Sequence, residues 1–163
     1  MIEIADTAHV SPLADIEDSV RGSRIVVGEN SSIDAFVKVK PAGGSGDLLI
    51  GARTAINSGC VLYTGNGIVI GDDCAIAANC TFAPVNHNFA RRDIPINRQG
   101  FQPSKGGILL ENDVWIGANC IILDGAVVRR GAVVGAGSLV RGEVAAYTIV
   151  AGNPLVQIGT RGA

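Results

Sequence analysis

The sequence predicts an all-β fold, a parallel β-helix in which every six residues form one short strand and one turn. A period of six is neither the 3.6 of an α-helix nor the alternation of a half-buried strand. The aliphatic residue that opens each hexad recurs without a break: Leu110, Ile116, Ile122, Val128, Val134 and Val140. The fifth residue of each hexad is small or β-branched: Val114, Cys120, Ala126, Ala132 and Ser138. Glycines and asparagines between them supply turn conformations that β-branched residues resist.

The same period extends toward the N-terminus, with interruptions. We expect Val20, in the fifth position of an early hexad, to face inward. The register slips over residues 21–25, resumes at Val27, and slips again by two residues after Ile68. Residues 41–47 (PAGGSGD) are rich in turn formers and are predicted to form an excursion on the surface.

The hexads stop after His87. Residues 88–105 (NFARRDIPINRQGFQPSK) contain two prolines, three arginines and no hexad spacing, which predicts one protruding loop. A long irregular insertion in a repetitive fold is usually functional or disordered. The coil is expected to end near Val150, and the tail from about 151 is too short for a second domain. The prediction is therefore a single β-helix domain over residues 1–163.

Composition limits the classes of function. Apolar residues make up 47% of the chain but aromatic residues only 4%, which suits a narrow interior filled with Ile, Val and Ala. The net charge is −2, so nucleic acid is not an expected partner. The N-terminus lacks the features of a signal peptide, and no apolar run approaches the roughly 18 residues of a membrane span. We expect a cytoplasmic protein without a membrane span.

The four cysteines form no C-x-x-C pair of the kind found in metal and redox sites. Cys60, Cys74, Cys80 and Cys120 each fall in the small fifth position of a hexad. A buried thiol in that position acts as a compact hydrophobic group. The sequence therefore predicts a structural role for all four and no metal site.

Two stretches resemble the hexapeptide acyltransferases, above all the maltose/galactoside and capsular-sugar O-acetyltransferase branches. They are IGDDCAIAANCTFAPVNH, residues 70–87, and NDVWIGANCIILDGAVVRRGAVVGAGSLV, residues 112–140, followed by AGNP at 151–154. The resemblance implies a left-handed coil, a single-stranded β-helix, and a homotrimer. It also implies acetyl-CoA as co-substrate and a sugar, polysaccharide or nucleotide sugar as acceptor, with no metal required.

His87 lies where this family has its catalytic base, just before the protruding loop. A sugar hydroxyl is a poor nucleophile and must lose its proton as it attacks the thioester. An imidazole can accept that proton at neutral pH, and such a base typically contributes about 10²–10⁴-fold to the rate. The resemblance implies this role for His87, whereas the residue taken alone favours a surface or packing histidine. His9 is expected to be a surface residue.

Four further residues are expected to contact the acceptor: Trp115, Asn57, Arg91 and Arg92. Trp115 is the only tryptophan, in an outward position, and the resemblance places it in a cleft between subunits, with trimer packing as the alternative. Asn57 matches an acceptor-binding asparagine of the family. The loop arginines, including Arg98, are expected to meet an anionic acceptor, with solvated surface charge as the alternative.

The residues expected to bind CoA are Ala118, Ala136, Arg141, Asn153, Pro154 and Arg161. The two alanines occupy turns whose backbone N–H groups, in similar enzymes, bind the thioester region and the pantetheine arm. Relatives commonly carry basic residues for the CoA phosphates where this chain has Gly142 and Gln157. The nearby Arg141 and Arg161 are therefore expected to supply that charge.

Three alternatives to an O-acetyltransferase bear on the same fold. An N-acetyltransferase of an amino sugar would use the same residues. A γ-type carbonic anhydrase holds zinc with three histidines, and this chain has only two. A non-catalytic scaffold or binding subunit would be expected to show a repeating outward ladder of threonine or charge, and none is present in the sequence.

Overall fold

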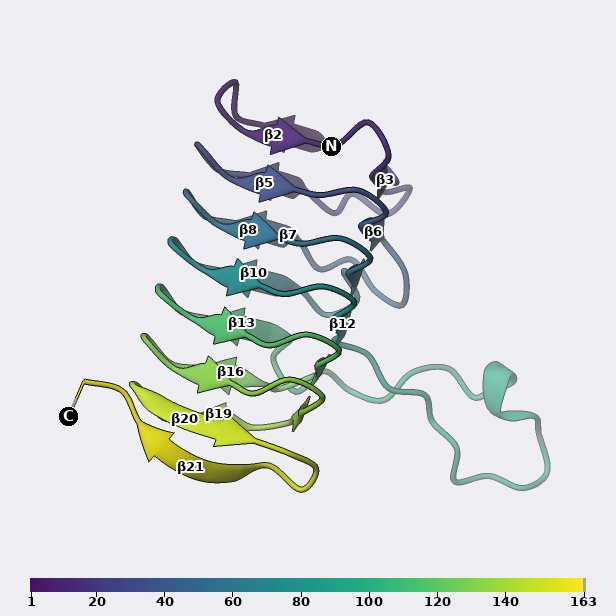
Figure 1. Ribbon diagram of the computed structural model, residues 1–163. Helices are drawn as coiled ribbons and strands as arrows, with labels where there is room; N and C mark the ends of the chain where they lie inside the picture. The colour runs from purple at the N-terminus through teal and green to yellow at the C-terminus, as the bar shows by residue number, and fades with distance from the viewer. Residues whose placement is uncertain (163) are drawn as a thin grey trace.

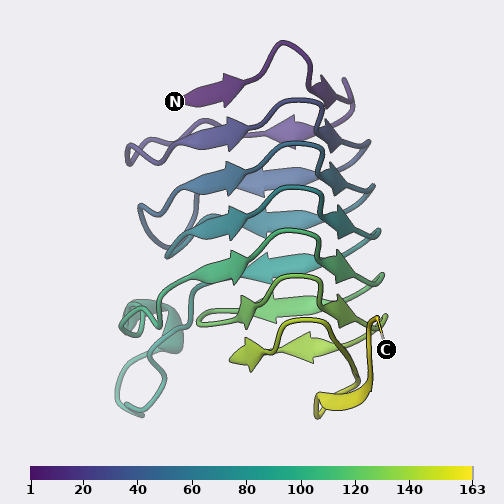
Figure 2. The same cartoon turned by 90° about the vertical axis from the view of Figure 1, so that its left-hand side faces the viewer.

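The computed structural model describes residues 1–162 as a left-handed parallel β-helix wound into a three-sided prism (Figure 1). Each coil adds one short strand to each of three sheets, which contain seven, eight and six strands. Seen after a quarter turn, the coils stack in sequence order from the N-terminus to the C-terminus (Figure 2). The predicted fold class is confirmed.

All strand pairs but one are parallel, and each strand pairs with its counterparts in the neighbouring coils. The first sheet contains β1 (Ile2–Ile4), β4 (Ile25–Val27), β7 (Leu48–Ile50), β10 (Ile68–Ile70), β13 (Ile108–Leu110), β16 (Val127–Val128) and β19 (Glu143–Val144). The second contains β2 (His9–Val10), β5 (Ser32–Ile33), β8 (Ala55–Ile56), β11 (Ala75–Ile76), β14 (Trp115–Ile116), β17 (Val133–Val134), β20 (Thr148–Ala151) and β21 (Val156–Thr160). The third contains β3 (Asp15–Ile16), β6 (Lys38–Lys40), β9 (Val61–Tyr63), β12 (Thr81–Ala83), β15 (Ile121–Leu123) and β18 (Leu139–Val140).

The hexad register sets the core. Ile116 pairs with Val134, one coil of 18 residues later, and both side chains are fully buried. Three hexads therefore make one coil, and their three aliphatic residues fill one layer of the prism. The outward neighbour Trp115 is 55% exposed, which confirms the alternation of inward and outward side chains.

The prism has three corners, of which the third varies strongly in length from coil to coil. In one coil the first corner comprises residues 111–114, between the first and second sheets, and the second corner comprises residues 117–120. The third corner leads from the third sheet to the first strand of the next coil. Its shortest example comprises residues 141–142, and its longest comprises residues 84–107. The register slip over residues 21–25 falls at this corner, and the slip that the sequence places after Ile68 arises just before that residue, in corner residues 64–67.

One expectation for the third corner was wrong. Val20 is 97% exposed, because it lies in an extended third corner rather than in a hexad. Residues 41–47 form a third corner at the surface, as their turn formers predict, and Gly46 N donates to Gly65 O at 2.9 Å in the next coil. A side-chain carbon on Gly46 would lie 2.1 Å from the nitrogen of Gly67, so this corner stacks too closely for any larger residue.

The fifth positions of the hexads form columns along the prism. The Cys60, Cys80 and Cys120 side chains are fully buried and Cys74 is 2% exposed, which confirms their structural place. Their thiols also donate to backbone carbonyls of the next coil, for example Cys80 Sγ to Gly117 O at 3.2 Å. These positions therefore join the coils as well as fill space.

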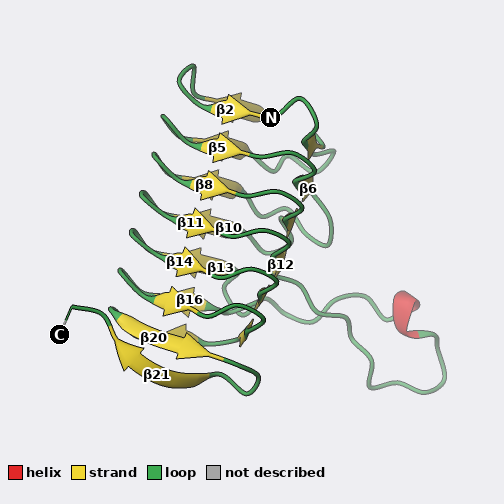
Figure 3. Cartoon of the chain, in the orientation of Figure 1, coloured by secondary structure: helices red, strands yellow, loops and turns green. Residues whose placement is uncertain are grey.

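The C-terminal tail adds a strand that the sequence did not predict. β21 pairs antiparallel with β20 and covers the last coil (Figures 1 and 3). The one helical segment described is η1, a 3-10 turn at Ile96–Arg98 in the protruding loop, drawn in red in Figure 3. Among the residues described, no helix has the length and apolar character needed to cross a membrane.

Candidate active site

His87 lies at the base of the protruding loop, in the third corner of the coil that contains β12. The two limbs of the loop meet there as a short antiparallel pair, with an isolated bridge between His87 and Phe101. Gln102 N donates to Asn86 O at 2.7 Å, and Asn88 N donates to Gly100 O at 2.9 Å. The limbs therefore fix the backbone on both sides of His87.

The imidazole of His87 is exposed and is supported by an aromatic ring. Its centroid lies 4.7 Å from that of Phe101, and the two rings are tilted by 43°. Within residues 1–162 the ring nitrogens have no hydrogen-bond partner. A lone pair on this imidazole is thus available to a molecule bound beside it.

Two hollows border His87 and differ in character. One hollow is lined by both polar and apolar side chains, including the cation Lys105. Its other lining residues are Asn86, Phe89, Ile96 and Gln102. The second is almost wholly apolar; its other lining residues are Ala42, Gly43, Tyr63, Ala83, Val85 and Phe101. The histidine stands between them, where an acceptor with a polar and an apolar side would meet the imidazole.

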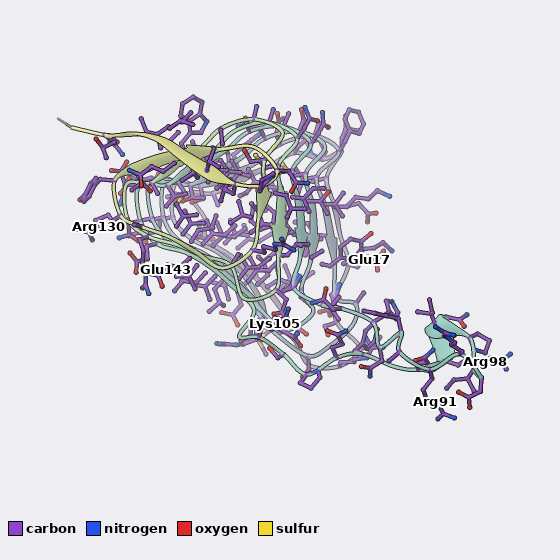
Figure 4. The ribbon with its side chains drawn as sticks, turned by 90° about the horizontal axis from the view of Figure 1, so that it is seen from below. Glu17, Arg91, Arg98, Lys105, Arg130 and Glu143 are labelled. Atoms are coloured by element: carbon purple, nitrogen blue, oxygen red, sulfur yellow. The ribbon has the colours of Figure 1, made fainter. Side chains whose placement is uncertain are left out.

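Within one chain the loop arginines Arg91 and Arg92 do not border either hollow, and their contact with an acceptor stays a prediction. Arg91 pairs with Asp93 at the far end of the loop, where Figure 4 also shows Arg98, well away from the prism. The Asp93 carboxylate raises the pKa of Arg91, and the guanidinium lowers the pKa of Asp93. Arg92 is exposed on the same segment.

The cation that lines the first hollow with His87 is Lys105, which the sequence reasoning missed. Figure 4 shows Lys105 where the protruding loop joins the prism. A signal for it exists in the sequence. Lys105 immediately precedes Gly106 and Gly107, after which the hexads resume, so it must return to the corner from which the loop departs at His87.

Trp115 and Asn57 do not meet His87 within one chain. Trp115 faces outward from the second sheet, which is the side of the prism opposite the third corner. Asn57 lies in the second corner, and its Nδ2 donates to Ile76 O of the next coil at 2.8 Å. The Asn57 amide thus takes part in the bonding between coils.

The residues expected to bind CoA are divided among all three corners. Ala118, Ala136, Asn153 and Pro154 follow strands of the second sheet and lie in the second-corner column, with a cis bond between Asn153 and Pro154. Arg141 lies in the third corner. Arg161 lies at the first corner, where its Nη1 contacts Asp113 Oδ2 at 2.8 Å, so the tail brings it away from the other residues.

The second corner offers unpaired backbone donors. Gly137 N donates to Ala118 O at 2.8 Å, and Gly117 N donates to Val134 O at 2.7 Å. Within residues 1–162 the N–H groups of Ala118 and Ala136 themselves have no acceptor. Because a side-chain carbon on Gly117 would lie 2.5 Å from the nitrogen of Ala136, the turns stack closely and leave these donors one above the other.

No group of three or more His, Cys, Asp or Glu side chains in residues 1–162 is arranged to hold a metal ion. The two histidines lie far apart on the prism, His9 on β2 in the first coil and His87 before the loop. The side chains at the candidate site are an imidazole, an ammonium, two amides, the phenol of Tyr63 and apolar groups.

Family models match two parts of the chain. Residues 107–142 match the bacterial transferase hexapeptide (six repeats) and residues 48–81 match the hexapeptide repeat of succinyl-transferase. WbbJ of Escherichia coli K12, a candidate lipopolysaccharide biosynthesis O-acetyl transferase, is 26% identical over 138 residues, which are 82% of this chain and 67% of that protein. The 2,3,4,5-tetrahydropyridine-2,6-dicarboxylate N-acetyltransferase of Staphylococcus aureus is 50% identical over 52 residues, 32% of this chain and 22% of the enzyme.

A solved structure matches almost the whole chain. AntD, an N-acyltransferase from Bacillus cereus, was solved with dTDP-4-amino-4,6-dideoxyglucose and coenzyme A in a variant form. It superimposes with a TM-score of 0.79 and 26% identity, over 99% of this chain and 84% of that one. The chain thus spans most of AntD, two thirds of WbbJ and about a fifth of the S. aureus enzyme.

Proposed function

We propose that this chain, which belongs to the hexapeptide-repeat transferase family, transfers an acetyl group from acetyl-CoA to a sugar or nucleotide-sugar acceptor. One observation carries the proposal. An exposed imidazole, His87, stands between a mixed and an apolar hollow and is supported by Phe101. The same chain carries, on its second corner, the unpaired N–H donors of Ala118 and Ala136 that suit the thioester end of CoA.

In the proposed reaction His87 acts as general base. The acceptor hydroxyl gives its proton to the imidazole while its oxygen attacks the carbonyl carbon of the thioester. The bond between that carbon and the CoA sulfur then breaks, and the sulfur takes the proton back from the imidazolium. The products are the acetyl ester and CoA with a free thiol, and no covalent enzyme intermediate forms.

A second copy of the chain completes the site in this proposal. His87 lies in the third corner, whereas Ala118, Ala136 and Trp115 lie in the second corner or on the second sheet. These surfaces point away from one another, so one CoA molecule meets both sets only where two chains adjoin. We therefore propose a homotrimer, and light scattering should report about three times the chain mass of 16.7 kDa.

The acceptor is proposed to carry a negative charge, because Lys105 is the cation that borders the hollow with His87. A nucleotide sugar meets that requirement. The likeness to WbbJ favours a hydroxyl as the attacking group, and the likeness to AntD favours an amine. An amine would attack in its neutral form and would make the same use of His87.

The experiment is a continuous assay of CoA thiol release from acetyl-CoA, screened against amino sugars, sugars and nucleotide sugars. Turnover that depends on one acceptor, with an acetylated product in mass spectrometry, supports the proposal. A calorimetric titration with CoA runs beside it. Absence of CoA binding would contradict the proposal and would favour the non-catalytic scaffold as the function.

A further inference from the structure

Asp124 is the one acidic side chain that the fold buries among residues 1–162, with 5% of its surface exposed. It lies in the third corner of the coil directly after the protruding loop. In the following coil the pairing of Ile122 with Val140 places Gly142 at the same position, where no side chain is present. A third corner of this prism can thus form without a carboxylate at this position.

The carboxylate is satisfied by hydrogen bonds alone. Oδ2 accepts from Lys105 N at 2.9 Å and from Asn66 Nδ2 at 3.2 Å, and Oδ1 accepts from Gly107 N at 2.9 Å. No ion pair to Asp124 forms among the described residues. Burying a charge without a counter-ion is costly unless its hydrogen bonds are complete, and bonds to a charged acceptor are the strong ones.

These hydrogen bonds connect the third corners on either side of the protruding loop. Asn66 belongs to the third corner before the loop and Asp124 to the third corner after it, while residues 84–107 of the coil between them extend outward (Figure 4). Asp124 therefore holds the returning limb of the loop at the point where an ordinary corner would have stacked. Gly125 N, which donates to Gly107 O, continues the same attachment.

The returning limb carries the groups around His87. Lys105, which Asp124 holds directly, borders the hollow beside the imidazole, and Phe101, four residues earlier, packs against the ring. Movement of this limb would displace both groups relative to His87. The prism itself would remain, because its core does not include the limb.

We propose that Asp124 is a positioning residue: its buried carboxylate anchors the returning limb of the loop and thereby sets Lys105 and Phe101 against His87. This inference rests on the proposed function of His87. It extends that proposal to a residue that contacts neither the reacting atoms nor the hollows.

The test compares Asp124→Asn with a matched control, Asp72→Asn. Asp72 Oδ1 also accepts from a backbone N–H of a neighbouring coil, Ala52 N at 2.8 Å, but in the first corner and away from the loop. Amide hydrogen exchange is followed by mass spectrometry on peptides that cover residues 101–107. Steady-state kinetics on the identified acceptor and a CoA titration accompany it.

For Asp124→Asn we expect faster exchange in residues 101–107, a loss of kcat of about 10²-fold through misplacement of the site, a raised acceptor KM, and unchanged CoA affinity. The control should match the wild type in all four. Unchanged exchange, faster exchange without a kinetic effect, or the same loss in Asp72→Asn would each overturn the proposal. If the wild type itself has no turnover, the proposed function fails, and the exchange comparison alone decides whether Asp124 holds the limb.

Discussion

Two adjacent isoleucines on β15 offer a direct test of the hexad register. Ile122 is fully buried and pairs along the prism with Phe82 and Val140, which are themselves fully buried. Ile121, the residue before it, points outward and is 42% exposed. Substitution of each by alanine removes the same atoms from opposite faces of one strand.

The expected cost differs strongly between the two. Ile122→Ala removes three buried carbons, worth about 2.4 kcal/mol at about 0.8 kcal/mol each. It also leaves a cavity that Phe82 and Val140 cannot fill, because hydrogen-bonded strands fix their backbones. We expect a loss of about 3–4 kcal/mol in the free energy of unfolding, within the range of such core truncations. For Ile121→Ala, which removes partly solvated carbons, we expect about 1 kcal/mol or less.

The assay is equilibrium unfolding in urea, with the midpoint and slope compared at one chain concentration, since assembly would make the midpoint depend on concentration. We expect a large shift of the midpoint for Ile122→Ala and a small one for Ile121→Ala. Equal costs for the two variants would refute the assignment of inward and outward positions, on which the whole description of the core depends.

Three further predictions concern the thiols, an ion-pair network and the acceptor. All four thiols are buried, so maleimide labelling at pH 7 should be slow until urea unfolds the chain, and rapid native labelling would contradict this burial. Their pKa values differ in direction: burial raises the pKa of Cys74, a hydrogen bond to Cys80 lowers that of Cys60, and that of Cys80 is raised to about 11, because the lowering by Cys120 is outweighed by the Cys60 thiol and burial. Arg129 lowers the pKa of Glu111 below its ordinary 4.5, so Glu111 stabilises the fold above that pH and loses this effect as the pH falls through the lowered value. Glu111→Gln should accordingly lower the Tm at pH 7 and have less effect at pH 3, whereas an equal effect at both would exclude the charge as its cause. Lys105→Ala should raise the KM of an anionic acceptor by about 10-fold or more and leave that of acetyl-CoA unchanged; an unchanged acceptor KM would remove Lys105 from the site.

The periodic part of the fold could be predicted because one physical rule, an aliphatic residue facing inward every six, repeats along the chain. Because three hexads make one coil, counting hexads in threes also shows which corner residues stack on one another along the prism. Asn57, Ala118 and Ala136 each follow the second hexad of a coil, whereas His87 and Arg141 follow the third. The separation of His87 from Ala118 and Ala136 was thus already contained in the hexad count.

The non-periodic segments could not be predicted in the same way. The pairing of Arg161 with Asp113 depends on β21 folding back along β20, and no spacing in the tail specifies that direction. Asp124 occupies an ordinary position of the repeat in sequence. Its function follows from partners that lie 17 to 58 residues away, in a loop and in an earlier corner.

The central claim is that His87 removes the acceptor proton, and the pH–rate profile of wild type and His87→Ala on one acceptor tests it most directly. The wild-type rate should fall on the acid side, because a protonated imidazole has no lone pair to accept the proton. The variant should lose about 10²–10⁴-fold in kcat, lose this acid limb, and bind CoA as the wild type does. A variant with near-wild-type kcat and the same acid limb would show that His87 is not the base.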